Sequence, residues 1–350
     1  MKLAPYYDDF VNKAGIAVPH SPKSFQVNLT NRCYSKCIGC RKYKWPGAQL
    51  TTEQVYKIID FLHENGGESI VFSGGEPFCH PDFKNIVNYA YDKKLYIGIL
   101  TSLILPHKLI KHGSYLNILA KADWVAVSID AMTSPKAYKR MRGVDALYYV
   151  VNRLDEIKLY NEESKTSYIN VRVNSTISNI NIDEMAAILV ACANLNIKRC
   201  DFFPIHTWND LKITDIVKAT KCVACAQQAL DRDKVRSNID SFISLMGRKW
   251  QSKCVAGFFH CFIDADGMMF PCCRLANDNG DFKERNLSYS FGHVNFLEDN
   301  HYGTQNNKIR AQLLKNANTP VCKECDRYNK INADYLEFTN IRDGRVKLFL

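Results

Sequence analysis

Residues 25–40 read FQVNLTNRCYSKCIGC and join a short apolar run to three closely spaced cysteines. The alternation in FQVNLT is typical of a half-buried strand, and Cys33, Cys37 and Cys40 follow directly after it. Thiols spaced this closely on a polar loop are unusual for cysteines that only fill a core. We therefore predict a strand that leads, at its carboxyl end, into a site that needs three thiolates.

Five more apolar, β-branched runs follow along the chain, and longer amphipathic segments separate them. The runs begin near residues 69, 95, 123, 168 and 200. Apolar residues at 55, 58, 59 and 62 have the spacing of one helix face. This alternation predicts an α/β fold with parallel strands and right-handed crossovers. Six units predict an incomplete barrel or an open sheet, with the chemistry at the carboxyl ends of the strands.

The pattern changes after residue 206. We expect residues 207–253 to form a connector and then a helix. The stretch HCFIDADGMMFPCC at 260–273 predicts a hairpin, which turns at Ala265, Asp266 and Gly267. Residues 281–350 are polar and irregular, with one helix expected near 305–317.

Composition limits the class of protein. The chain has 350 residues, enough for roughly two domains, is 46% apolar and contains no stretch of ~20 uncharged apolar residues that would span a membrane. Its net charge is +10, but the basic residues are dispersed, so we expect neither nucleic acid nor membrane as a partner. The first residues lack the apolar run of a secretory signal, which predicts a cytoplasmic protein. Its 14 cysteines are then candidates for metal sites rather than disulfides.

The C-x3-C-x2-C spacing after the first strand resembles the radical S-adenosylmethionine (SAM) superfamily. Three cysteines do not complete the four ligands of structural zinc, but they can hold a cubane and leave one iron open. The resemblance implies a [4Fe–4S] cluster on Cys33, Cys37 and Cys40, with SAM on the open iron. It also implies a 5'-deoxyadenosyl radical, a partial (β/α)6 TIM-like barrel and an electron donor of the flavodoxin or ferredoxin type.

One position departs from the family pattern. The residue before the third cysteine is usually aromatic, and here it is Gly39. Packing against adenine is then expected from Ile38, Tyr34 or Tyr43.

Further segments support the resemblance. FSGGEPF resembles the family's GGEP motif, which implies that the SAM amino group is bound by Gly74, Gly75, Glu76 and Pro77. Small polar residues after the third and fourth strands are expected at the SAM carboxylate or ribose, namely Ser102, Ser128 and Asp130.

The fifth predicted strand offers two more candidates. Arg172 and Asn174 lie two positions apart, so their side chains should project to the same face and line the cavity if that face is inward.

A second cysteine set lies in the C-terminal part. The spacing C-x17-C-x49-C-x2-C supplies four thiolates, enough for a cubane or for zinc, from Cys254, Cys272, Cys322 and Cys325. This resembles the "twitch" module, a shortened SPASM domain, and implies one closed auxiliary [4Fe–4S] cluster on a hairpin plus helix. The expected divisions are an N-terminal extension at 1–24, the radical SAM barrel at 25–206, the connector and helix at 207–253, the auxiliary domain at 254–326 and a tail at 327–350.

The other cysteines have simpler interpretations. Cys79, Cys192 and Cys200 are expected to be buried thiols. Cys273 should face away from its neighbour Cys272 because successive strand side chains point oppositely. An alternative brings four thiols together around a further metal, namely Cys222, Cys225, Cys261 and Cys273.

These observations lead to one main function and several alternatives. We expect hydrogen-atom abstraction from a small molecule, with oxidation favoured and the auxiliary cluster taking up an electron. The alternatives are a radical epimerase with a cysteine hydrogen donor, a maturase of a ribosomally made peptide, and a non-catalytic zinc or iron–sulfur protein. The first strand begins near residue 25, which leaves too little chain for a peptide-recognition module of roughly 80 residues and favours a small molecule.

Overall fold

The computed structural model describes residues 23–40, 47–111, 113–205, 209–246, 254, 256–277, 287–297, 304–315 and 322. Its strands join into one sheet with the order β10-β9-β8-β1-β2-β3-β4-β5-β6-β7. Eight of them run parallel: β1 (Ser24–Asn28), β2 (Ser69–Ser73), β3 (Tyr96–Thr101), β4 (Trp124–Ser128), β5 (Val171–Ile177), β6 (Arg199–Pro204), β7 (Arg236–Ser237) and β8 (His260–Ile263). Two short antiparallel strands, β9 (Met268–Phe270) and β10 (Gly292–His293), extend the sheet beyond β8.

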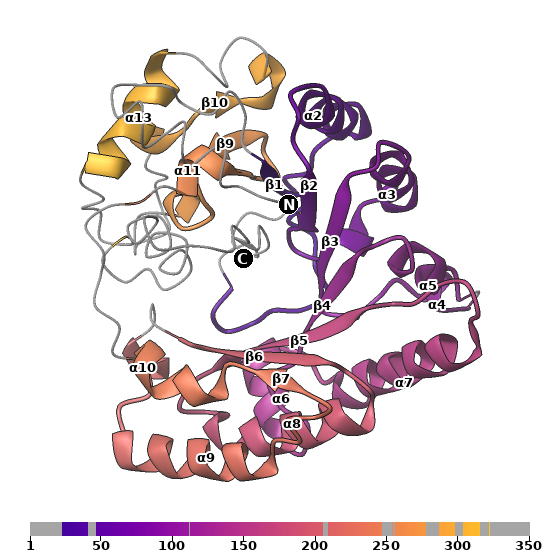
Figure 1. Ribbon diagram of the computed structural model, residues 1–350, viewed down its shortest axis with the longest axis vertical. Coiled ribbons are helices and arrows are strands. Elements are labelled where there is room, and N and C mark those ends of the chain that lie inside the picture. The colour runs from indigo at the N-terminus through magenta and orange to yellow at the C-terminus, as the bar shows by residue number, and fades with distance from the viewer. Residues whose placement is uncertain are drawn as a thin grey trace.

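Helices connect the parallel strands and lie on the convex side of the curved sheet (Figure 1). They are α2 (Thr52–Glu64), α3 (Phe83–Asp92), α4 (His107–Lys111), α5 (Ser114–Leu119), α6 (Pro135–Arg142), α7 (Leu147–Glu163), α8 (Met185–Asn194) and α9 (Ile216–Ala229). The later helices are α10 (Phe242–Met246), α11 (Ala256–Phe259) and α13 (Thr304–Lys315). The architecture is the expected partial barrel: among the described residues, β7 and β10 end the sheet and do not pair with each other.

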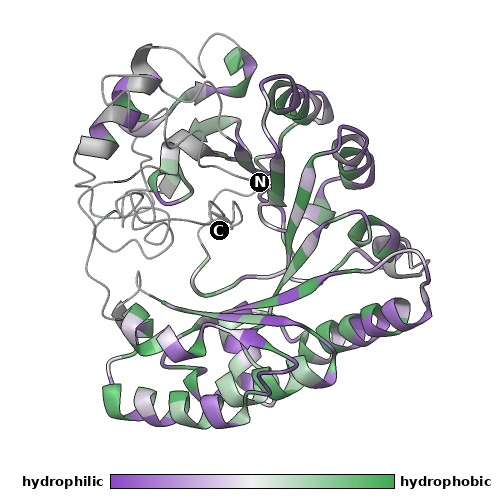
Figure 2. Ribbon diagram, viewed as in Figure 1, coloured by the Kyte–Doolittle hydropathy of each residue, from purple (hydrophilic) through white to green (hydrophobic). Residues whose placement is uncertain are grey.

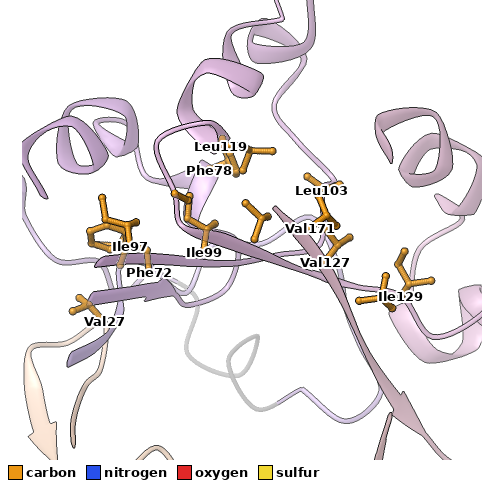
Figure 3. Close-up of a cluster of buried hydrophobic side chains, with 14 of the residues drawn as sticks. Val27, Phe72, Phe78, Ile97, Ile99, Leu103, Leu119, Val127, Ile129 and Val171 are labelled. Atoms are coloured by element: carbon orange, nitrogen blue, oxygen red, sulfur yellow. The ribbon is translucent and has the colours of Figure 1, made fainter. Parts of the chain in front are cut away.

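The main core fills the space between the sheet and these helices. Figure 3 shows the buried side chains of alternate strand residues, such as Val27, Phe72 and Val127, pointing toward the helices. Their strand neighbours occupy the other, concave face, and Figure 2 shows hydrophobic and hydrophilic residues alternating along the strands. One face of each strand therefore holds the fold together and the other is available for a site.

The six predicted strands correspond to β1 to β6, and the predicted hairpin corresponds to β8 and β9. The helix expected near 305–317 is α13. The prediction of a connector was wrong for residues 216–229, which form α9. The Asp215 side chain caps this helix by accepting from Lys218 N at 2.8 Å. In the described part of the helix predicted after the connector, residues 236–246 form β7, a 3-10 turn and the short α10 instead.

The predicted hairpin joins the sheet through β1. Residues Ser24 to Val27 pair in parallel with His260 to Ile263. The hairpin turns at Asp264 to Gly267, where Gly267 adopts a φ of 83°. One continuous sheet thus crosses the predicted division at residue 254. The predicted extension and tail lie almost entirely outside the described residues.

Candidate functional site

The carboxyl ends of β1 and β2 are joined by backbone hydrogen bonds just where the candidate motifs begin. Gly75 N donates to Thr30 O at 2.6 Å, and Glu76 N donates to Arg32 O at 2.8 Å. Gly74 has a φ of 138°, and a Cβ there would lie 2.5 Å from Thr30 O. The two glycines thus let the 74–77 segment touch the start of the cysteine loop.

Glu76 is fully buried and holds the carboxyl end of β3. Its carboxylate accepts from Thr101 Oγ1 at 2.7 Å, from Ser102 N at 2.8 Å and from Ser102 Oγ at 2.6 Å. Burial raises the pKa of Glu76, and these three donors oppose the shift. Ser102 therefore binds Glu76 through both its backbone amide and its hydroxyl. Pro77 starts the short 3-10 helix Pro77–Cys79 that follows.

The cysteine loop brings three partly exposed thiols together on one segment. Ser35 N donates to Cys33 Sγ at 3.3 Å, and Cys40 N donates to Cys37 O at 2.9 Å. Burial raises the pKa of Cys33 to about 12, and the Glu76 carboxylate adds to this shift. Burial also raises the pKa of Cys37. Such thiols are neutral until a metal displaces their protons.

Two of the residues proposed to pack on adenine lie on this loop. Tyr34 and Ile38 are exposed by 52% and 40%, so both side chains are accessible to a ligand. Tyr43 lies outside the described residues.

Ser128 and Asn174 lie side by side near the carboxyl end of the sheet. They are register partners on β4 and β5, and both are partly exposed on the concave face. Asp130 lies just beyond them but is only 3% exposed, and its Oδ2 is 2.7 Å from Arg142 Nε. Ser128 and Asn174 are therefore better placed to contact a ligand than Asp130.

Arg172 shares the concave face with Asn174, as predicted, but it lies near the amino end of β5. Its guanidinium carbon is 3.6 Å from the centre of the Trp124 ring, and Trp124 is the first residue of β4. Gly98 leaves the space for this indole, since a Cβ there would lie 2.1 Å from it. Arg172 therefore lies toward the end of the strands opposite to the cysteine loop.

Three of the four auxiliary cysteines lie in the described residues and border the main core. Cys272 is 6% exposed and accepts from Leu275 N at 3.4 Å. Cys254 N donates to Leu313 O of α13 at 2.9 Å, and Cys322 packs at the same core. Cys325 lies outside the described residues. Cys273 packs instead against Phe262 and Phe270 in a separate cluster, so it faces away from Cys272 as predicted.

A line of buried polar side chains joins the barrel to the auxiliary hairpin. Gln26 Nε2 donates to Ser73 Oγ at 3.1 Å, and Ser73 Oγ donates to Asn28 Oδ1 at 2.5 Å. Asn28 Nδ2 then donates to Asp264 Oδ1 at 2.9 Å, in the turn between β8 and β9. The sequence analysis missed this line. The polar residues at alternate positions of β1 were its only signal.

The four-cysteine alternative for a further metal is wrong. Cys222 and Cys225 lie on α9, whereas Cys261 is buried in β8, and Figure 1 shows α9 and the β9 hairpin at opposite ends of the molecule. No group of three or more His, Cys, Asp and Glu side chains in the described part surrounds a common point for a single metal ion. That result concerns a single ion, since cubane thiolates bind different irons.

Cys192 and Cys200 are buried, as expected, while Cys79 is partly exposed. None of the described helices is long and apolar enough to cross a membrane.

Two family models match the chain. Residues 27–173 match the radical SAM superfamily, and residues 254–326 match the SPASM iron–sulfur cluster-binding domain. The first model spans the cysteine loop and the GGEP segment, and the second spans the four auxiliary cysteines.

Two curated relatives are similar in sequence. An S-adenosylmethionine-dependent nucleotide dehydratase of Selenomonas ruminantium is 32% identical over 179 residues, which cover 47% of this chain and 61% of the relative. A PqqA peptide cyclase of Bradyrhizobium diazoefficiens is 23% identical over 286 residues, which cover 78% of this chain and 72% of the relative.

Crystal structures of Streptococcus suis SuiB share the fold. With S-adenosylmethionine bound, SuiB gives a TM-score of 0.62 at 16% identity, over 92% of this chain and 76% of that chain. With its precursor peptide SuiA bound, it gives 0.60 at 15% identity, over 92% and 74%.

Proposed function

Because the chain belongs to the radical SAM superfamily and carries a C-terminal SPASM domain, with SAM and two [4Fe–4S] clusters as its cofactors, we propose that it oxidises a small-molecule substrate by hydrogen-atom abstraction. One observation carries the proposal. The three-thiol loop and the 74–77 segment, far apart in sequence, are hydrogen-bonded to each other at the carboxyl end of the sheet.

Each group of residues has a separate task. Cys33, Cys37 and Cys40 would hold the SAM-binding cluster, which supplies the electron that cleaves SAM to methionine and a 5'-deoxyadenosyl radical. The Gly74–Gly75 backbone fixes the loop against β2. Ser128 and Asn174 are the side chains that we assign to hydrogen bonds with SAM or substrate.

The electrons balance as follows. SAM would supply the radical that removes one hydrogen atom from a substrate C–H bond and would leave a carbon radical on the substrate. Loss of one proton and one electron from that radical gives the product oxidised by two electrons. We assign the electron to the auxiliary cluster, held by Cys254, Cys272, Cys322 and Cys325, and the first electron to an external donor.

Peptide modification is the second candidate. The match to the peptide cyclase covers 78% of this chain, more than the 47% covered by the nucleotide dehydratase. The nucleotide dehydratase has the higher sequence identity to this chain, and this similarity favours a small polar substrate. A reducing cytosol suits both candidates, because free thiols persist there and can bind iron.

The donor would approach beside Cys37. Lys36 on the cysteine loop and Lys139 and Arg140 on α6 are exposed, and Lys36 N donates to Arg142 O at the end of that helix. This basic flank suits the acidic face of a flavodoxin- or ferredoxin-type protein. We expect Arg140→Glu to slow flavodoxin-driven SAM cleavage but not dithionite-driven cleavage, whereas Lys221→Glu on α9 should change neither rate.

The main test uses the full chain reconstituted with iron and sulfide under anaerobic conditions. Addition of dithionite and SAM should yield 5'-deoxyadenosine, measured by liquid chromatography and mass spectrometry. A variant with alanine at Cys33, Cys37 and Cys40 should yield none. Equal yields from the two proteins would reject the role of the three thiols, and no 5'-deoxyadenosine from either protein would favour a non-catalytic metalloprotein.

Reaction class can then be separated in the same assay. Oxidation predicts a product two hydrogens lighter and no solvent deuterium on carbon. Epimerisation predicts a product of unchanged mass in H2O that gains one deuterium in D2O.

A further inference from the structure

The cysteine loop docks through its backbone onto the end of α6. Lys36 N donates to Arg142 O at 3.0 Å, and Ile38 N donates to Met141 O at 3.0 Å. Gly143 caps the helix with a φ of 67°, and a Cβ there would lie 2.2 Å from Lys36 O. Two amides that flank Cys37 are therefore fixed by one turn of α6.

The Arg142 side chain connects this dock to a buried carboxylate. Arg142 is 9% exposed, its Nη1 donates to Cys37 Sγ at 3.8 Å, and its Nε lies 2.7 Å from Asp130 Oδ2. A buried ion pair stabilises a protein only when its remaining atoms are also hydrogen-bonded. Asp130 meets this condition, since its Oδ1 accepts from Thr176 N at 2.8 Å.

The position of Asp130 is fixed by its surroundings. Asn181 Nδ2 donates to Asp130 O at 2.7 Å. The segment after Asp130 is held by the Glu184 carboxylate, which accepts from Met132 N and Thr133 N, each at 2.8 Å. Both carboxylate oxygens of Asp130 are therefore bound to protein groups.

We propose that Asp130 and Arg142 form a positioning pair in which Asp130 directs the Arg142 guanidinium at Cys37, holding the loop in place and raising the reduction potential of the SAM-binding cluster. The proposal rests on the proposed function, because it requires a cluster on Cys37. Hydrogen bonds and positive charge at a cluster thiolate stabilise the more negative, reduced form. The Arg142 guanidinium provides both a hydrogen bond and a positive charge, and the Asp130 carboxylate fixes the direction in which the guanidinium points.

Two variants and one control test the pair. Asp130→Asn keeps an acceptor for Thr176 N but removes the charge that orients Arg142, and Arg142→Lys keeps a positive charge without the planar fork. Asp145→Asn is the control, because it removes an exposed carboxylate that lies 3.5 Å from Lys139 beside the same helix. Thermal unfolding of the three cluster-free variants shows whether each one folds.

The first readout is made on the cluster-free chain. Hydrogen exchange at the Lys36 and Ile38 amides should be faster in Asp130→Asn than in wild type, and unchanged in Asp145→Asn. Unchanged exchange at both amides would overturn the positioning role. This measurement does not depend on SAM chemistry, so it distinguishes failure of the pair from failure of the proposed function.

The second readout is made on the reconstituted enzyme. The cluster of interest is identified as the one whose electron paramagnetic resonance signal changes when SAM is added. Its midpoint potential should fall in Asp130→Asn and fall less in Arg142→Lys. Its iron should be lost to a chelator ~10- to 100-fold faster in Asp130→Asn, the usual effect of removing a residue that orients a ligand. An unchanged potential with unchanged iron loss would reject the proposal even if activity fell.

Discussion

The two cysteine regions lie on opposite sides of β1 and are held in different ways. The catalytic loop continues from the carboxyl end of β1, and three ligands within eight residues depend on contacts with α6 and the 74–77 segment. The auxiliary cysteines come from separate segments between residues 254 and 325, and their hairpin is held by the pairing of β8 with β1. The ligands of the first site are close together in sequence, so that site depends on the segments that contact its loop. The ligands of the second site lie on separate segments, so that site depends on how the chain folds.

Removal of an auxiliary ligand should separate the two regions most clearly. Cys272→Ala is expected to lose about half of the iron, about four of about eight atoms, because only the auxiliary cubane needs it. SAM cleavage should continue, while product formation should fall below detection because the substrate electron has no acceptor. Iron analysis and deoxyadenosine yield measure the two effects. Loss of SAM cleavage in this variant would show that the regions are not independent.

The contact between the 74–77 segment and the catalytic loop gives the next largest effect. Gly74→Ala would place a Cβ 2.5 Å from Thr30 O at a positive φ, so we expect a loss of roughly 2–4 kcal/mol in unfolding free energy. The SAM-binding cluster should also load poorly.

Gly113→Ala is the matched control for that change. Gly113 also has a positive φ, but no atom lies within 4 Å of a Cβ built there, so the loss should be only roughly 1 kcal/mol. Equal losses of unfolding free energy for the two variants, measured by urea unfolding, would mean that the cysteine loop shifts at little cost to make room for the Cβ at residue 74.

The line of buried polar side chains from Gln26 to Asp264 tests how the auxiliary hairpin is held against the barrel. Asn28→Ala removes the donor to Asp264 Oδ1 and the acceptor for Ser73 Oγ, so we expect a loss of roughly 1–3 kcal/mol. Chelator-driven iron loss should accelerate for the auxiliary cluster and not for the SAM-binding one. The opposite order would indicate that β1 transmits the change to the loop at its carboxyl end.

Sequence patterns predicted the parts of this molecule that are encoded locally. β1 to β6 follow from alternating apolar residues, and the β8–β9 hairpin follows from its turn residues. α9 was missed although its buried residues at 219, 223 and 226 have helical spacing after a capping Asp215, because the polar and cysteine-rich segment resembles a connector. Local patterns do not specify which strands pair, so the junction of β8 with β1 could not be predicted.

The same limit applies to the site. The cysteine loop and the 74–77 segment are recognisable because their residue spacing is itself the signal. The link from Asp130 through Arg142 to Cys37 depends on three side chains separated by up to 105 positions, and no periodicity encodes such contacts. Polar residues at strand ends showed where the site lies but not which of them contact a ligand and which contact the protein.

The smallest expected effect concerns the exposed contact between α2 and the auxiliary part. Gln54 Nε2 donates to Asn295 Oδ1 at 2.9 Å in a solvent-exposed hydrogen bond. Asn295→Ala removes this bond but leaves the Gln54 cap of α2 intact, so unfolding free energy should change by less than about 0.5 kcal/mol. Neither cluster should lose iron faster, because the β1–β8 pairing carries the junction. A larger change in the urea midpoint would show that the auxiliary part also relies on its surface contact with α2.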